Sequence, residues 1–375
     1  MFRVLRWSAT TCTRRCGVIV ATMLALGTYG GWASSQISPV PAVAQADVIP
    51  LADLAVDLGG SRTPRPPATG NTRGYELVAA PARWEVLPGV GADAYAYNGQ
   101  VPGPTIRVTE GDTLRVTLRN ELDDPTSIHW HGLHVPNAMD GVPPFTQDAV
   151  EPGASFTYEF TVSHAGTFMY HSHVDAAEQI DRGLYGPLIV DPQPGTTQPT
   201  QFDKEFTMML SAWNIPQPAD GAAAATADMA GMDMAEEPAA DEVAVEEPAN
   251  LSMQMAYNYF TINGKAFPAA PAWSVDEGDL VRVRLINISN LAHPMHLHGQ
   301  DFKVVAKDGE TLRPEQQLMM NTVSIDAGET YDIVFVADAP GTWAFHCHEL
   351  HHTENDGVEP GGLLQVIETR GAERP

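Results

Sequence analysis

An internal repeat places the strongest constraint on how this chain can fold. Residues 110–132 match residues 277–299 at a constant spacing of 167 positions. Residues 166–173 match residues 341–348 at a similar spacing, of 175 positions. Self-similarity at a nearly fixed spacing indicates two copies of one folding unit. The chain of 375 residues is also long enough for two domains with a core each.

The apolar pattern within each copy is that of β-strands. Phe156 and Tyr158 begin a run in which apolar residues alternate with polar ones, which is the period of a half-buried strand. The 32 glycines and 30 prolines fit numerous short strands and turns better than long helices. We therefore predict an all-β protein with two tandem Greek-key β-sandwich domains, at residues 74–192 and 204–370, joined by a linker at residues 193–203.

Histidines show where the chemistry of the chain is concentrated. None of the 13 histidines precedes residue 129, and most of them fall in four short motifs. The motifs are His129-Trp130-His131, His171-Ser172-His173, His293-Pro294-Met295-His296-Leu297-His298, and His346-Cys347-His348 with His352. Residues two apart in a strand point to the same face, so each His-x-His pair presents two imidazoles together. Eight such imidazoles are too many for one metal ion and indicate a multinuclear site.

Cys347 adds a second type of metal ligand. The only other cysteines, Cys12 and Cys16, lie in the first 46 residues, so the remainder of the chain has no partner for a disulfide. A single cysteine with two histidines and no further cysteine indicates a type 1, or blue, copper site for electron transfer.

Over residues 84–368 the chain resembles the multicopper oxidase family, the laccase-like enzymes, because all four histidine motifs of that family occur in order. The resemblance implies cupredoxin-like domains and four copper ions per chain: one type 1, one type 2 and a type 3 pair. It assigns the type 1 ion to His293, Cys347 and His352, and the type 2 ion to His129 and His296. It assigns the type 3 pair to His131, His171, His173, His298, His346 and His348.

The resemblance also implies a reaction, in which one-electron oxidation of phenolic, aromatic or similar reductants is coupled to four-electron reduction of O₂ to water. Cys347 lies between two type 3 histidines, which gives electrons a short covalent path to the multinuclear site. Asp140 matches the acidic residue of the family and is the expected proton donor, although Asp140-Gly141 also suits a simple turn. Glu354, or alternatively Glu349, is the expected second donor.

Two features depart from the family pattern. The loop after the last type 1 histidine is longer than usual, so Leu363, or alternatively Leu364, is expected at the axial position. A leucine cannot coordinate, which predicts a three-coordinate type 1 copper of comparatively high potential. The first domain has Thr126, Ser172 and Ala177 at the positions that correspond to the type 1 ligands, so only the second domain is expected to hold this ion.

The first 46 residues predict an export signal. Arg14-Arg15 precedes an apolar stretch from Gly17 to Trp32, as in a twin-arginine signal, and an uncleaved membrane anchor is the alternative. Residues 47–73 are rich in proline and predict an extended lead-in. We therefore expect a periplasmic or extracellular protein. Its net charge of −26 argues against nucleic acid and anionic membrane surfaces as partners.

An acidic insertion interrupts the second domain. Residues 219–249 hold nine Asp or Glu and no Lys, Arg or His, and such a segment is not expected to fold alone. Met229, Met232 and Met234 could collect Cu(I) through their thioethers, or the segment is a solvated linker. Copper collection would favour the alternative function, a Cu(I) oxidase that acts in copper tolerance.

Two other copper proteins fit the ligand pattern less well. A non-enzymatic copper-binding protein would need neither a type 3 pair nor a cysteine between two histidines. A copper nitrite reductase would carry its type 1 ligands in the first domain. The expected partners are therefore O₂ and a small-molecule or metal-ion reductant.

The number of ligands predicts an oligomer. Each domain supplies four histidines of the type 2 and type 3 set, and a tandem pair has only one internal interface. The chain lacks the middle domain that spaces the outer domains of three-domain relatives. If one head-to-tail contact recurs between chains, three chains close a ring of six domains, as in the two-domain relatives. We predict a homotrimer, with each multinuclear site shared between neighbouring chains.

Overall fold

The computed structural model describes residues 70–195, 201–216 and 257–371. The predicted export signal and the acidic insertion lie outside the described residues, as does nearly all of the predicted lead-in. In the part of the chain that is described, no helix is both long enough and apolar enough to cross a membrane.

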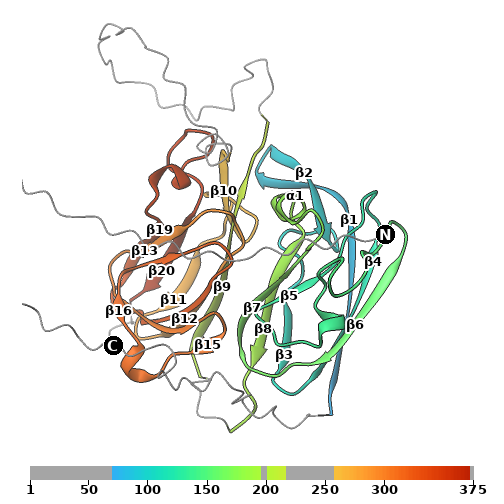
Figure 1. Cartoon of the computed structure of the whole chain (residues 1–375). Coiled ribbons are helices and arrows are strands. Elements are labelled where there is room, and N and C mark those ends of the chain that lie inside the picture. The colour runs from blue at the N-terminus through green and yellow to red at the C-terminus, as the bar shows by residue number, and fades with distance from the viewer. Residues whose placement is uncertain (1–69, 196–200, 217–256, 372–375) are drawn as a thin grey trace, which may run out of the picture. The chain divides into compact units, whose positions relative to one another are not determined.

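The first domain is a β-sandwich of two four-stranded sheets (Figure 1). Its elements are β1 (Thr72–Leu87), β2 (Val90–Tyr97), β3 (Ile106–Thr109), β4 (Thr113–Asn120), β5 (His129–His131), η1 (Asn137–Met139), β6 (Ser155–Thr161), β7 (Gly166–His171), α1 (Ala176–Asp181) and β8 (Tyr185–Asp191). One sheet has the order β2-β1-β4-β6 and the other the order β3-β8-β7-β5. Strands that are neighbours in a sheet are thus mostly distant in sequence, as in a Greek-key fold.

The second domain repeats this plan with more strands. Its elements are β9 (Lys204–Trp213), β10 (Tyr259–Ile262), β11 (Trp273–Asp276), β12 (Leu280–Asn287), β13 (His293–Leu297), β14 (Phe302–Lys307), β15 (Glu310–Thr311), η2 (Pro314–Gln316), β16 (Met319–Met320), β17 (Thr322–Ile325), β18 (Thr330–Val336), β19 (Gly341–Cys347), η3 (Leu350–Thr353) and β20 (Leu364–Arg370). One sheet has the order β10-β9-β12-β18-β14-β15, with β16 beside β14, and the other the order β11-β20-β19-β13-β17. The prediction of an all-β protein with two tandem sandwich domains is confirmed.

Apolar residues alternate with polar ones along the strands, and this alternation determines which face of each sheet packs on the core. Leu114 and Val116 in β4 are fully buried, and so are the equivalent Val281 and Val283 in β12. Arg115, which lies between the first two, is exposed. Burial of each side chain of this size contributes roughly 1.5–3 kcal/mol to folding. A shift of the strand by one residue would expose all of these side chains, so the alternation determines which face turns inward.

A separate apolar cluster joins the two domains. Met169 and Tyr185 of the first domain are buried with Met209, Trp213 and Ile286 of the second. Because this cluster contains strand residues from both sandwiches, the two domains bury a common apolar contact rather than being tethered only by the linker.

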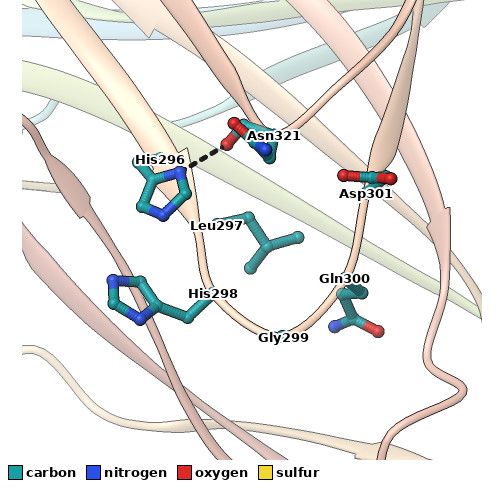
Figure 2. A pocket seen from close by; sticks show the side chains of 7 residues that line it. All are labelled: His296, Leu297, His298, Gly299, Gln300, Asp301 and Asn321. Atoms are coloured by element: carbon teal, nitrogen blue, oxygen red, sulfur yellow. Dashed lines mark hydrogen bonds between the residues drawn. The ribbon is translucent and has the colours of Figure 1, made fainter.

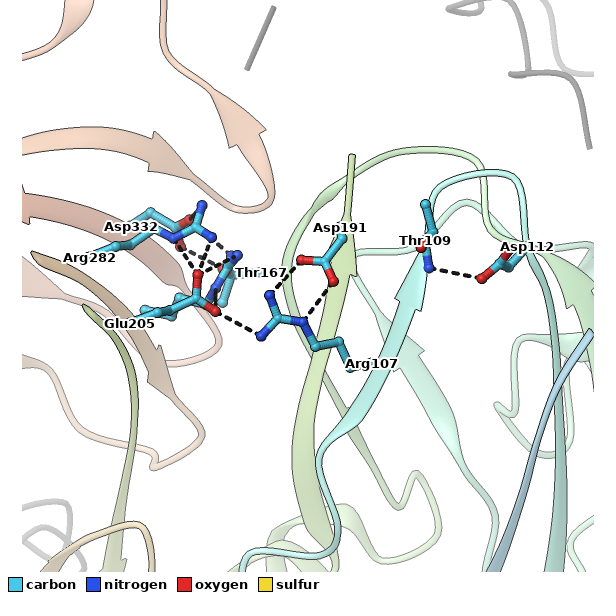
Figure 3. Close-up of polar contacts among 9 residues, drawn as sticks. Arg107, Thr109, Asp112, Thr167, Asp191, Glu205, Arg282 and Asp332 are labelled. Atoms are coloured by element: carbon cyan, nitrogen blue, oxygen red, sulfur yellow. Dashed lines mark hydrogen bonds and ion pairs between the residues drawn. The ribbon is translucent and has the colours of Figure 1, made fainter. Parts of the chain in front are cut away.

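A polar network, partly buried, also joins the two domains (Figure 3). Arg284 donates to Asp332 Oδ2 at 3.0 Å and to Thr167 Oγ1 at 2.5 Å, and Thr167 in turn donates to Asp332 Oδ1 at 2.5 Å. Arg107 of the first domain also forms an ion pair with Glu205 of the second, at 2.9 Å. The bonds of Thr167 attach β7, the strand that ends in His171, to β12 and β18 of the second domain, and the Arg107–Glu205 pair attaches β3 to β9.

Candidate metal centres

Three predicted type 1 ligands meet inside the second domain. Cys347 Sγ lies 3.5 Å from His352 Nδ1 and 3.8 Å from His293 Nδ1, and the two Nδ1 atoms lie 3.1 Å apart. All three side chains are buried. One thiol and two imidazole nitrogens therefore form a closed triangle.

The fold positions this triangle from three separate segments. His293 begins β13, Cys347 ends β19, and His352 lies in η3. Met295 pairs with Cys347 in the register of β13 and β19, which places His293 on the same face as the thiol. Ser289 Oγ lies 2.7 Å from His293 Nε2, so this contact leaves Nδ1 of the ring directed at Cys347.

The donor set of the triangle fits a copper ion. Burial lowers the pKa of both His293 and His352 to about 3, so both imidazoles are neutral at pH 7 and can ligate. Burial also raises the pKa of the Cys347 thiol to about 12, so a cation must displace that proton in order to bind. With bonds of about 2.0 Å to nitrogen and 2.3 Å to sulfur, trigonal donors lie roughly 3.5 Å apart.

The first domain brings its four predicted ligands together. His129 pairs with His171 across β5 and β7, and His131 Nδ1 lies 3.2 Å from His171 Nε2. The His173 ring lies 5.4 Å from that of His129. We call His129, His131, His171 and His173 the first-domain set.

The second domain brings together the equivalent histidines. His298 Nε2 lies 3.0 Å from His346 Nε2, and the rings of His296 and His348 are 5.8 Å apart. His296, His298 and Gln300 are among the residues that line an open hollow, and Figure 2 shows how they lie. The volume of this hollow is about 340 Å³. We call His296, His298, His346 and His348 the second-domain set.

Backbone carbonyls orient four of these eight rings. His129 Nδ1 lies 2.8 Å from Asp140 O, and His296 Nδ1 lies 2.9 Å from Asn321 O. His171 and His346 each place Nδ1 against the carbonyl of the next residue, at 2.8 and 2.7 Å. A ring that donates from Nδ1 keeps its lone pair on Nε2, where a metal can bind.

The structure keeps the two sets apart within one chain. All eight histidines are described, and each close ring contact among them joins two members of the same set. His173, His298 and His348 are exposed to solvent. The first-domain set therefore exposes one imidazole, that of His173, and the second-domain set exposes two, those of His298 and His348.

The two predicted proton donors differ in their surroundings. Asp140 follows η1 and lies beside His129, with Oδ1 3.5 Å from His129 Nδ1. Glu354 directly follows η3 on the side of the Cys347 triangle, and among the described residues its carboxylate has no hydrogen bond or ion pair. The alternative, Glu349, is exposed next to His348. Its backbone contacts two type 1 candidates, since Glu349 O accepts from His352 N at 2.9 Å and its N–H hydrogen-bonds the Cys347 thiol. Asp140 is thus the candidate whose carboxylate lies against a histidine of the predicted type 2 and type 3 set.

Some contributors were missed by reasoning from sequence. Ser289, Asn321 and Thr322 hold His293 and His296, and no motif spacing marks them. The sequence Asn321-Thr322 at the start of a strand was the only available signal, and it is too common to be informative.

Comparisons with known proteins agree with this geometry. Family models described as multicopper oxidase match residues 79–195 and residues 242–358. The multicopper oxidase MmcO of Mycobacterium tuberculosis is 33% identical over 277 residues, which cover 72% of this chain and 53% of that protein. Copper resistance protein A of Pseudomonas syringae pv. tomato is 32% identical, over 64% of this chain and 42% of that protein. The chain thus spans about half the length of these curated relatives.

A solved structure covers the described fold more completely. The blue copper oxidase from Nitrosomonas europaea is 33% identical, with a TM-score of 0.66, over 80% of this chain and 86% of that one. The two matched domains, the motifs in order and this structural likeness together place the chain in the multicopper oxidase family.

Proposed function

We propose that this chain is an oxidase that couples one-electron oxidation of phenolic, aromatic or similar reductants to the reduction of O₂ to water. The observation that carries the proposal is the position of Cys347. Its thiol closes the buried triangle, while the adjacent His346 and His348 belong to the second-domain set. Copper ions, when bound, would supply the one-electron redox chemistry and the site at which O₂ is reduced.

We assign His293, Cys347 and His352 to the type 1 ion, with Leu363 at the axial position. Leu363 is fully buried, and its carbonyl accepts a hydrogen bond from the Cys347 backbone N–H at 3.0 Å. An aliphatic side chain offers no donor atom there. We assign the first-domain and second-domain sets to the type 2 ion and the type 3 pair, with His129 and His296 on the type 2 ion.

We assign proton delivery to Asp140. Reduction of one O₂ to two waters consumes four protons, so an acidic group close to the site is required. Asp140 contacts His129 through both its carbonyl and its carboxylate, and its side chain is 31% exposed, so it can exchange protons with water. Glu354 remains the proposed second donor.

Each multinuclear site is shared between chains in this proposal. The two sets occupy equivalent sheets, β3-β8-β7-β5 and β11-β20-β19-β13-β17, whereas the contact inside the chain joins β7 to the other sheet of the second domain. In this proposal the contact between chains is therefore a different one, so the ring alternates two contacts where the sequence alone predicted the recurrence of a single head-to-tail contact. A closed ring of three chains with four copper ions per chain satisfies both contacts.

Exposed apolar side chains support this interface. Phe145, five residues after Asp140, is 84% exposed, and Leu318 and Met319, just before Asn321, are 60% and 61% exposed. These exposed apolar residues are close in sequence to Asp140 and Asn321, which contact His129 and His296, and such residues suit burial against a second copy of the chain.

A Cu(I) oxidase in copper tolerance is the second candidate. The likeness to copper resistance protein A and the methionines at positions 229, 232 and 234 favour it. Either function suits export to the periplasm or the extracellular space, which we propose from the arginines and apolar stretch of the first 46 residues.

Oxygen consumption by the copper-loaded protein tests the proposal. The number of electrons taken from the reductant per O₂ consumed should be measured in parallel reactions with a phenol and with Cu(I). Hydrogen peroxide should be measured in the same reactions. We expect four electrons per O₂, no accumulated peroxide and a higher rate with the phenol. A higher rate with Cu(I) would favour the second candidate, and a fully loaded protein that consumes no O₂ with either reductant would exclude both.

A further inference from the structure

The first domain has a buried polar triangle where the second domain has its type 1 ligands. Gln179 Oε1 accepts hydrogen bonds from Thr126 Oγ1 at 2.8 Å and from Ser172 Oγ at 2.5 Å, and the two hydroxyl oxygens lie 3.2 Å apart. The three residues are 0–2% exposed. Gln179 Nε2 donates to Pro125 O at 2.9 Å, so both polar groups of the side-chain amide are hydrogen-bonded.

This triangle links the same segments as the Cys347 triangle. Thr126 precedes the His129–His131 pair as His293 precedes the His296–His298 pair. Ser172 corresponds to Cys347 in the repeat. Gln179 lies in α1, which follows β7 as η3 follows β19. The repeat spacing pointed to Ala177 as the counterpart of His352, but Gln179 occupies the third corner.

The backbone beneath both triangles is also equivalent. Ser172 N donates to Leu184 O at 3.1 Å, as Cys347 N donates to Leu363 O at 3.0 Å. A glycine with positive φ precedes each leucine, Gly183 at 116° and Gly362 at 53°. The two sites therefore share one framework, closed by hydrogen bonds in the first domain and by metal ligands in the second.

The hydrogen-bonded triangle acts directly on the first-domain set. Ser172 lies between His171 and His173, and its carbonyl lies 2.8 Å from His171 Nδ1. The backbone N–H of His173 donates to Ser127 Oγ at 3.3 Å. Fixing Ser172 from its side chain therefore fixes the direction of the two neighbouring imidazoles.

We propose that Gln179 is a positioning residue that holds the first-domain set in its metal-binding geometry before any metal binds. In the second domain the corresponding side chains are proposed metal ligands, so we expect the cross-link between them to tighten when the Cys347 triangle binds its ion. This inference rests on the proposed function, because it presumes that the first-domain set binds copper.

Hydrogen exchange on the copper-free protein gives a direct test. The amides of Ser172, Gln179 and Leu184 should be protected with or without copper, whereas those of Cys347 and Leu363 should gain protection on copper loading. In Gln179→Met, which keeps the side-chain length but removes both hydrogen-bonding groups, the first group should exchange at least about 10-fold faster. Unchanged exchange of that group in Gln179→Met would overturn the proposal.

Copper binding gives the second readout. Gln179→Met should keep the full blue absorption of the type 1 site but need roughly 10–100-fold more free copper to develop the type 2 paramagnetic signal. Gln179→Glu should restore binding, because a buried neutral carboxyl keeps both the acceptor and a donor. Leu188→Ala, a core variant of the same domain, controls for general loss of stability and should leave the type 2 signal in place.

The outcomes separate this inference from the proposed function. A wild-type protein without any type 2 signal would contradict the proposed function, whereas equal signals in wild type and Gln179→Met at limiting copper would contradict the role of Gln179. If Gln179→Met does not fold, Thr126→Val carries the same test with one hydrogen bond removed, and an unshifted copper requirement would again overturn the proposal.

Discussion

In the second domain Arg284 lies opposite Asp332 across β12 and β18, whereas the equivalent positions of the first domain hold Thr117 opposite Thr157. The two threonine hydroxyls lie 3.1 Å apart and are partly buried. Arg284 is 2% exposed, because Thr167 of the first domain covers it. The same strand positions therefore carry a simple hydroxyl pair in one domain and a buried ion pair in the other.

The comparison shows how a repeated fold acquires different sites. A buried ion pair is weak support for stability by itself, because both charges lose their hydration. Here Thr167 adds hydrogen bonds to both charges and belongs to β7, which ends in His171. The ion pair thus anchors the strand β7 to the second domain, whereas the Thr117–Thr157 pair joins two strands of the same sheet.

The equivalent residues Cys347 and Ser172 should give the largest contrast. Cys347→Ser removes the thiolate ligand, so we expect complete loss of the blue absorption and at least a ~100-fold loss of oxidase activity with the fold intact. Ser172→Ala should keep the blue absorption, because the type 1 ion lies in the other domain. Absorption spectra of the two purified variants at equal copper content check this, and a copper-loaded wild type without colour would contradict the assignment.

A smaller contrast is expected between Glu205 and Glu159, which form ion pairs with the equivalent Arg282 and Arg115. Burial tends to raise the pKa of Glu205, but Arg284 and Arg282 outweigh it and lower that pKa to about 2. Because the folded-state pKa is depressed, the stabilisation is present above about pH 4.5 and is lost as the pH falls towards 2. Glu205→Gln should therefore destabilise the protein by about 2 kcal/mol at pH 7, and this difference should shrink below pH 4.5.

Glu159→Gln is the matched control, since both partners of its ion pair are more than half exposed. Its effect should stay within about 0.5 kcal/mol at every pH. Urea unfolding of the wild type and both variants at pH 7, 4 and 3 measures the two differences. Equal effects of the two substitutions would contradict the distinction between the domains.

The smallest effect is expected from the acidic insertion. It separates β9 from β10, whereas only Pro88 and Gly89 separate the equivalent β1 and β2. Deletion of residues 219–249 should change stability by less than about 0.5 kcal/mol and leave phenol oxidation within about twofold, because β9 and β10 stay paired. A selective fall in Cu(I) oxidation would assign copper collection to the insertion, and equal loss of both activities would contradict a loop role.

Much of the fold followed from the sequence because the repeat and the alternating pattern are local signals. The pairing of His-x-His motifs on strands likewise follows from a period of two. Gln179 could not be predicted, because it lies seven residues after Ser172 whereas His352 lies five residues after Cys347, so the repeat spacing does not align the two. The Arg284–Thr167 contact could not be predicted either, because it depends on how the domains pack.

We propose that each multinuclear site is shared between the first domain of one chain and the second domain of another. Mixing Cys347→Ser chains with chains that carry His129→Ala and His131→Ala tests this sharing. Neither parent should be active, because one lacks the type 1 site and the other lacks the first-domain set.

Equal mixing and co-refolding should restore about one quarter of the wild-type oxygen consumption, because a quarter of the interfaces then combine an intact first domain with an intact second domain. Light scattering of the same sample should give a trimer. A mixture that stays as inactive as its parents, or a wild-type monomer that reduces O₂, would contradict the shared site.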